Sequence, residues 1–135
     1  MTTLVDTNVL LDVVTMSPAW MTPSLMALER ALSEGVLIVD DIVYAELSVG
    51  LESTADTDAV LRSVDVILAP IPREALFLAG KAFKSYRESG GTRTGVLPDF
   101  FIGAHALVEN IPLLTRDPKR YRTYFPTVEL IVPTA

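Results

Sequence analysis

Short apolar runs, separated by stretches with helical periodicity, constrain the fold of this chain more than any other feature. The clearest run is Val36–Val39, whose continuous apolar character is typical of a strand covered on both faces. Strands are predicted at residues 3–5, 36–39, 66–69, 112–115 and 128–132. Helices are predicted at residues 9–14, from 23 or 24 to about 35, and at 42–52, 55–65, 73–88 and 100–109. Strands that alternate with helices predict an α/β fold, with a parallel sheet wrapped by helices.

Length and composition favour one cytoplasmic domain. The chain has 135 residues, half of them apolar, which suits a single packed core. It contains no apolar run of the roughly 18 residues that span a bilayer, and no basic segment typical of a signal peptide precedes the first strand. The absence of cysteine excludes disulfides, thiolate metal sites and a thiol nucleophile.

The charge distribution is uneven along the chain. The net charge of −6 argues against a general nucleic-acid-binding protein. Residues 1–72 nevertheless carry −9, whereas residues 73–135 carry +3. The bases of the second half fall into two groups: Lys81, Lys84, Arg87 and Arg93, then Arg116, Lys119, Arg120 and Arg122. These bases are either ordinary solvated helix faces or, collectively, a rim that follows a phosphate backbone.

Three acids are expected near the carboxyl ends of the parallel strands, where ligands bind in open α/β sheets. Asp6 follows the first strand and is either a helix N-cap or part of a site. Asp117 leaves the strand 112–115, in an Asp-Pro sequence that is also a common turn. Asp99 begins the helix 100–109, where the helix dipole favours an acid. Gly103 and Ala106 share its face, which we expect to leave room beside the carboxylate.

Glu46 is the fourth and most diagnostic acid. At 100° per residue it falls near the middle of the apolar arc of the helix 42–52. An uncompensated buried carboxylate is very costly, so we expect a basic partner or a metal ion to meet it. Bases are scarce in this half of the chain, which favours the metal.

The four carboxylates, Asp6, Glu46, Asp99 and Asp117, define a candidate site if they converge. A pair about 4 Å apart would repel by roughly 4 kcal/mol at an effective dielectric of 20, so a cluster must bind cations or take up protons. Oxygen ligands without His or Cys suit Mg²⁺ or Mn²⁺, which can activate water against a phosphate. The single histidine, His105, lies about 240° around its helix from Asp99 and is assigned to structure. Having only one histidine excludes two-histidine cleavage of RNA through its 2′-OH.

Several other residues have a structural interpretation. Asp40 and Asp41 are predicted to cap the helix that follows them. Met16, Trp20, Met21 and Met26 form an apolar cluster, for which core packing is the default and a partner groove the alternative. The chain contains no phosphate-binding glycine run of the Walker A or Gly-x-Gly-x-x-Gly type.

Four segments in this order resemble PIN-domain ribonucleases, in particular the VapC-like toxins of type II toxin–antitoxin pairs. They are Leu4–Leu10, Val43–Leu47, Leu97–Ala104 and Leu114–Asp117. The resemblance implies a single PIN domain over residues 1–135, a three-layer α/β/α sandwich with a mostly parallel, twisted sheet of about five strands. It also implies that the four acids form a metal pocket, supported by Asn8 and Thr115. Mg²⁺-dependent cleavage of RNA, a homodimer and an inhibitory antitoxin partner are further implications of the resemblance.

We therefore expect hydrolysis of RNA by water, with one or two Mg²⁺ ions held by the four acids and products that carry 5′-phosphate and 3′-OH ends. Substrate phosphates are expected to contact Arg93, Arg116, Lys119 and Arg120. Two alternatives remain open: an inert interaction module with a PIN-like fold, and a phosphomonoesterase that uses the same metals. An idle acid cluster would only destabilise the protein, which argues against the inert module.

Overall fold

The protein, described here by a computed structural model over residues 1–134, is built on a five-stranded sheet with the order β3-β2-β1-β4-β5. The strands are β1 (Thr2–Val5), β2 (Val36–Val39), β3 (Val66–Leu68), β4 (Leu113–Leu114) and β5 (Leu130–Ile131). Every paired neighbour runs parallel, as the alternation of strands and helices predicts. The order of the strands along the chain reverses at β1, because β2 and β3 extend the sheet on one side and β4 and β5 on the other.

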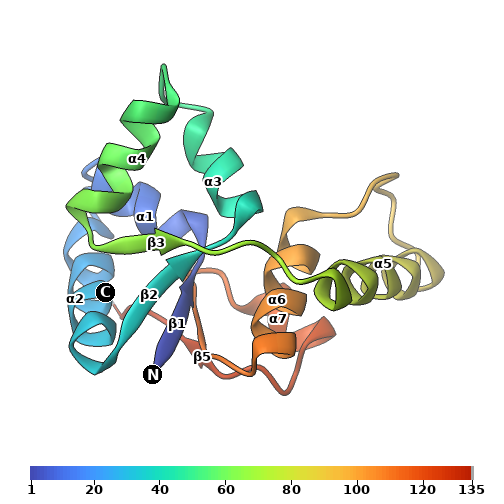
Figure 1. Ribbon diagram of the computed structural model, residues 1–135. Helices are drawn as coiled ribbons and strands as arrows, with labels where there is room; N and C mark the ends of the chain where they lie inside the picture. The colour runs from blue at the N-terminus through green and yellow to red at the C-terminus, as the bar shows by residue number, and fades with distance from the viewer. Residues whose placement is uncertain (135) are drawn as a thin grey trace.

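Helices cover both faces of this sheet (Figure 1). They are α1 (Thr7–Val14), α2 (Met21–Glu34), α3 (Asp41–Ser48), α4 (Thr54–Ser63), α5 (Arg73–Glu88), α6 (Pro98–Glu109) and α7 (Lys119–Tyr124). Helices α1 and α2 pack on one side, and α5, α6 and α7 lie on the other, while α3 and α4 stand beyond the ends of the strands. The predicted α/β/α sandwich is confirmed. None of the helices in the described residues is long and apolar enough to cross a membrane.

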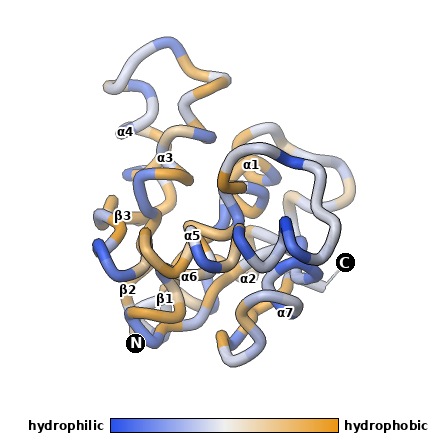
Figure 2. Tube along the Cα trace, turned by 90° about the vertical axis from the view of Figure 1, so that its right-hand side faces the viewer, coloured by the Kyte–Doolittle hydropathy of each residue, from blue (hydrophilic) through white to orange (hydrophobic). Residues whose placement is uncertain are grey.

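The core lies between the sheet and its helices. Leu4, Val5, Leu37, Leu113 and Leu114 are completely buried, which explains why the short strands are almost entirely apolar. Helix α6 buries six of its residues and is largely hydrophobic in Figure 2.

The helices differ from the sequence prediction at two places. Helix α3 ends at Ser48 instead of Glu52, and the Ser48 hydroxyl bonds the carbonyl of Tyr44 within its last turn. The bend that follows contains Gly50, a poor helix former. Helix α7 was not predicted, because its six residues, mostly basic and polar, have no apolar stripe; only Tyr121 among them is buried.

The methionine cluster does not pack as core. Met16 is 67% exposed and Met26 is 63% exposed, whereas Trp20 and Met21 are half-buried. Met16 also has a positive φ of 54°, in the turn that follows α1. The default prediction of core packing is therefore wrong for the two outer methionines, which lie on the surface.

Candidate functional site

The reversal of strand order places the ends of β1 and β4 side by side, which is where α/β sheets bind ligands. Val5 pairs with Leu114, so the next residue of each strand, Asp6 and Thr115, emerges at the same edge. The Thr115 hydroxyl donates to Asp6 Oδ2 at 2.8 Å, and the amide of Thr7 donates to Asp6 Oδ1 at 2.7 Å. Asp6 thus caps α1 and also faces the strand switch point.

Tyr121, on α7, connects Asp6 to a second acid. Its hydroxyl lies 2.8 Å from Asp6 Oδ2 and 3.4 Å from Asp99 Oδ1. Tyr121 is almost fully buried, and this burial, together with the two nearby carboxylates, raises the pKa of its hydroxyl well above the ordinary value. The hydroxyl therefore stays protonated and acts as a donor between the two acids.

Both acids ionise less readily than free aspartate. Burial raises the pKa of Asp6 from 3.8 to about 6, against the opposing effect of hydrogen bonds from Tyr121 and Thr115. Burial also raises the pKa of Asp99, and the nearby Arg120 partly offsets this effect. Paired acids with raised pKa values in one place are typical of functional sites.

Glu46 joins the site through Thr7. The Thr7 hydroxyl donates to Glu46 Oε1 at 2.7 Å, while the Thr7 amide bonds Asp6. Glu46 is only half-buried, because α3 stands beyond the ends of the strands and is not covered on all sides. In the described residues no base pairs with Glu46, and a neutral hydroxyl is its hydrogen-bond partner; the expected metal contact stays a prediction.

Asp117 is held at the same edge by its main chain. Its amide donates to Thr115 Oγ1 at 3.1 Å, and its exposed carboxylate is close enough to raise the pKa of Asp99. Asn8 accepts a hydrogen bond at 3.1 Å from the amide of Arg116. The structure thus brings all four predicted acids, here called the acid cluster (Asp6, Glu46, Asp99 and Asp117), to one region, with Asn8 and Thr115 beside them.

The acids do not, however, form a ready-made cage. Within residues 1–134 no three His, Cys, Asp or Glu side chains are close enough together to hold a metal ion between them. The hydroxyls of Thr7 and Tyr121 donate to the carboxylates, but the charge of Asp99 still raises the pKa of Asp6, so part of the repulsion remains.

The donor set still suits a hard cation. All candidate ligands are oxygens, and Mg²⁺ usually binds through one or two carboxylates while keeping several waters. Asp6 and Asp99, which share one hydroxyl, are the pair best placed to hold such an ion.

The predicted phosphate contacts separate into different groups. Arg120 bonds Asp99 through Nη1 at 3.3 Å, at the rim of the acid cluster. Lys119 and Arg93 are exposed, on α7 and on the loop after α5. Arg116 instead binds Asp12, at 2.7 and 3.0 Å, so its side chain is directed to α1.

The small residues on α6 have a structural role. A side chain added at Gly103 would clash with the ring of Phe125, so the space expected beside Asp99 is filled by Phe125. His105, which is 1% exposed, bonds Asp40 at 3.1 Å. Asp40 also accepts the amides of Ile42 and Val43 and thereby caps α3, as predicted.

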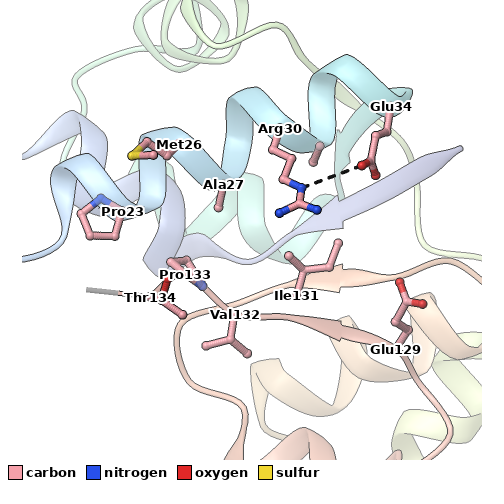
Figure 3. A pocket seen from close by; sticks show the side chains of 11 residues that line it. Pro23, Met26, Ala27, Arg30, Glu34, Glu129, Ile131, Val132, Pro133 and Thr134 are labelled. Carbon is pink, nitrogen blue, oxygen red and sulfur yellow. Dashed lines mark ion pairs between the residues drawn. The ribbon is translucent and has the colours of Figure 1, made fainter.

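A separate groove of about 480 Å³ opens between α2 and the edge strand β5 (Figure 3). The exposed Met26 and the half-buried Pro23 line one end of it, and Glu129 lies at the other. No member of the acid cluster lines this groove. It is therefore a different surface from the candidate site.

Sequence reasoning missed three residues that organise the site: Thr7, Asp12 and Tyr121. Thr7 lies between Asp6 and Asn8, which both drew attention, so its polar position was an available signal. Asp12 stands four residues after Asn8 and hence on the same face of α1. Tyr121 had no local signal, because its role depends on how α7 packs against α6.

Comparisons with known proteins show the family and the fold of this chain. The model of the PIN domain family matches residues 3–126. The fold is similar to that of a chain of VapBC2 from Rickettsia felis bound to promoter DNA, with a TM-score of 0.75, 19% identity and coverage of 99% of this chain and 100% of that one. For VapBC-1 from nontypeable Haemophilus influenzae the TM-score is 0.72, with 20% identity and 98% of both chains covered. At the level of sequence, none of the curated proteins compared with this chain matches it.

Proposed function

This chain belongs to the PIN domain family, and we propose that it is a metal-dependent endoribonuclease, the toxin of a type II toxin–antitoxin pair. One observation carries the proposal. The buried carboxylate of Asp6 and the carboxylate of Asp99 share the hydroxyl of Tyr121 at the strand switch point, with Glu46 and Asp117 beside them. The hydroxyls offset only part of the cost of gathering these carboxylates, because the pKa values of Asp6 and Asp99 stay raised; a cationic ligand would offset the rest.

The reaction we propose is hydrolysis of the phosphodiester by water attacking in line, which leaves 5′-phosphate and 3′-OH ends. Mg²⁺, or Mn²⁺ in its place, would supply an activated water and offset charge on the phosphate. Asp6 and Asp99 would hold the ion, and Glu46 and Asp117 would orient its waters. Tyr121, Thr115 and Thr7 keep the carboxylates of Asp6 and Glu46 in place through the hydrogen bonds described above.

The substrate assignment rests on the basic rim. Arg120 and Lys119 on α7, with Arg93 on the loop after α5, supply positive charge for a phosphate backbone on an otherwise acidic protein. Arg120 is the one whose side chain directly contacts an acid of the cluster, so it is the best placed to meet the scissile phosphate.

An antitoxin partner and a homodimer are part of the proposal. The structures to which the fold is similar include VapBC structures and a toxin–antitoxin complex from Klebsiella pneumoniae, the latter at 18% identity and a TM-score of 0.66. Exposed Met16 and Met26 on this chain provide apolar surface of the kind that partners cover. Purification of the native complex is expected to recover a small second protein. A clean, stable homodimer without that protein would count against the antitoxin partner.

Digestion of end-labelled and internally labelled RNA with a Mg²⁺ titration tests the activity. We expect internal cuts by the wild type that vanish with EDTA and with Asp6→Ala, whereas Arg62→Lys, far from the cluster on α4, cuts normally. Loss of only a terminal phosphate would support the phosphomonoesterase alternative. No change in any RNA at any Mg²⁺ concentration would support an inert interaction module.

A further inference from the structure

The side chain of Arg116 is bound to α1 and to the segment that follows it. Its Nε lies 2.7 Å from Asp12 Oδ2, and its Nη2 lies 3.0 Å from Asp12 Oδ1, which is a forked ion pair. Asp12 is only 4% exposed. A forked pair between a guanidinium and a carboxylate is strong and directional, so this contact fixes where the arginine lies.

Two neighbours complete the environment of this ion pair. The guanidinium carbon of Arg116 lies 4.9 Å from the centre of the Trp20 ring, in a cation–π contact. Ser24, at the start of α2, donates to the same Asp12 oxygen at 2.7 Å. The pair is thus enclosed by α1, by α2 and by the turn that joins them.

The main chain of Arg116 is held by the same helix. Its amide donates to Asn8 Oδ1 at 3.1 Å, and Asn8 lies one turn before Asp12 on α1. Helix α1 therefore holds both the backbone and the side chain of one residue. That residue stands between Thr115, which donates to Asp6, and Asp117, a member of the acid cluster.

We propose that Arg116 is a positioning residue, which locks the turn carrying Thr115 and Asp117 onto α1 and so sets the geometry of the acid cluster. It is not a contact to the RNA backbone. The fork holds the guanidinium against α1 through Nε and Nη2. A phosphate that drew it away would leave the buried carboxylate of Asp12 with only the Ser24 hydroxyl as a partner, which is strongly unfavourable. The inference rests on the proposed nuclease function, because the acid cluster is the site that Arg116 would organise.

Two substitutions, Arg116→Lys and Asp12→Asn, distinguish a positioning role from a phosphate contact. Lysine keeps the positive charge but cannot make the fork, and Asp12→Asn leaves Arg116 intact while weakening its anchor. For both variants we expect kcat to fall about tenfold or more, as for outer residues that orient ligands. The half-saturating Mg²⁺ concentration should rise several-fold, while KM for RNA changes less than about twofold.

A direct phosphate contact predicts a different pattern. In that case Asp12→Asn would free the guanidinium, so KM for RNA would fall or stay unchanged with kcat intact. Arg116→Lys would raise KM and spare kcat. Either of these results overturns the proposal. A double variant whose loss equals that of one single variant supports it, because both changes break one interaction.

Fluorescence gives a readout that does not depend on cleavage. Trp20 is the only tryptophan of the chain, so its emission reports on the guanidinium stacked against it. We expect a shift in emission for Arg116→Lys and for Asp12→Asn, but not for the controls Arg62→Lys and Asp56→Asn on α4. An unchanged spectrum in both test variants would overturn the proposal. If Asp12→Asn fails to fold, Arg116→Lys alone tests the proposal, because Arg116 is half-exposed and its substitution is tolerated more easily.

The same measurements separate this inference from the proposed function. Wild-type protein that shows no Mg²⁺-dependent cleavage refutes the nuclease itself, whatever the fluorescence shows. Wild-type protein that cleaves RNA while Arg116→Lys keeps the same kcat and Mg²⁺ requirement refutes only the role of Arg116.

Discussion

Tyr121 donates its hydroxyl hydrogen to Asp6 across 2.8 Å, although the two residues lie 115 positions apart in the chain. Both are buried, and the same hydroxyl lies within 3.4 Å of Asp99. A neutral donor thus stands between two carboxylates, where a metal ion is proposed to bind. The relation explains how the metal-free protein tolerates these acids, and the first two predictions depend on it.

Removal of the Tyr121 hydroxyl is expected to weaken metal binding. Hydrogen bonding by Tyr121 lowers the pKa of Asp6, so Tyr121→Phe should raise that pKa further and make protons stronger competitors of Mg²⁺. We expect half-saturating Mg²⁺ to rise about tenfold at neutral pH, and the acid limb of the pH–activity profile to move to higher pH. Tyr124→Phe, on the same helix, is the matched control. An unchanged profile would contradict this role.

The stability of the metal-free protein should depend on the protonation of Asp6. Because the pKa of Asp6 is 3.8 unfolded and about 6 folded, the folded state binds a proton in this window that the unfolded chain does not. This contribution is fully present below pH 3.8 and is lost as pH rises through about 6, by roughly 3 kcal/mol in total.

Urea unfolding in EDTA, for wild type and Asp6→Asn between pH 4 and 7.5, checks this prediction. The free energy of unfolding of the wild type should fall relative to the variant as pH rises, and saturating Mg²⁺ should restore most of the loss at pH 7. Parallel pH curves for the two proteins would show that Asp6 titrates normally.

The Thr7 hydroxyl is expected to support Glu46 in catalysis. Thr7→Val keeps the shape of the side chain but removes the 2.7 Å hydrogen bond to Glu46, so the carboxylate loses its fixed orientation. We expect cleavage to fall about tenfold, whereas Thr7→Ser, which retains the hydroxyl, should fall far less. Equal losses in both variants, measured as kcat/KM on one RNA, would attribute the effect to packing.

Arg120 is expected to affect metal and RNA in opposite directions. Its guanidinium neutralises part of the Asp99 charge, so Arg120→Ala should lower the Mg²⁺ concentration needed for half-saturation by a few fold. KM for RNA should rise, because one phosphate contact is lost. Calorimetric titration with Mn²⁺ and steady-state kinetics measure the two effects, and Arg122→Ala is the control for net charge. Weaker metal binding in Arg120→Ala would refute the idea that the Arg120 guanidinium competes with the metal ion for Asp99.

Asp40 is expected to matter for stability and not for chemistry. Its carboxylate caps α3 by accepting hydrogen bonds from two main-chain amides, and it also bonds the buried ring of His105. Asp40→Ala therefore removes a cap and leaves a buried imidazole unpaired. The expected cost is roughly 3 kcal/mol in the free energy of unfolding. Ser53→Ala removes the cap of α4 without a buried partner and should cost about 1 kcal/mol. Similar losses in both variants would show that His105 contributes little.

Much of the fold could be predicted from local sequence. Val36–Val39 and the other apolar runs indicated buried strands, and the periodic stretches between them indicated helices, because burial on two faces and on one face leave different patterns. The helix α7 could not be predicted in this way, since its six residues have no apolar stripe. Asp40 was predicted as a cap and is one, because capping depends on neighbouring residues alone.

The candidate site was only partly predictable. Asp6, Glu46, Asp99 and Asp117 were proposed as site residues from their places at strand and helix ends, and the structure brings them to one region; their catalytic role stays a prediction. Helical periodicity alone suggested deeper burial of Glu46 than α3 provides, and its partner in the structure is the Thr7 hydroxyl; a metal contact stays a prediction. Arg116 looked like one of several surface bases, and its forked bond to Asp12 was invisible at a separation of 104 residues.

The sequence by itself therefore determined the order of strands and helices, the membership of the PIN family and the four acids that reach one edge of the sheet. Tertiary structure alone decided which neutral groups stand between those acids, and which base turns inward to hold the site. The reason is physical: propensity and periodicity are properties of neighbouring residues, whereas a hydrogen bond between distant segments depends on how whole elements pack.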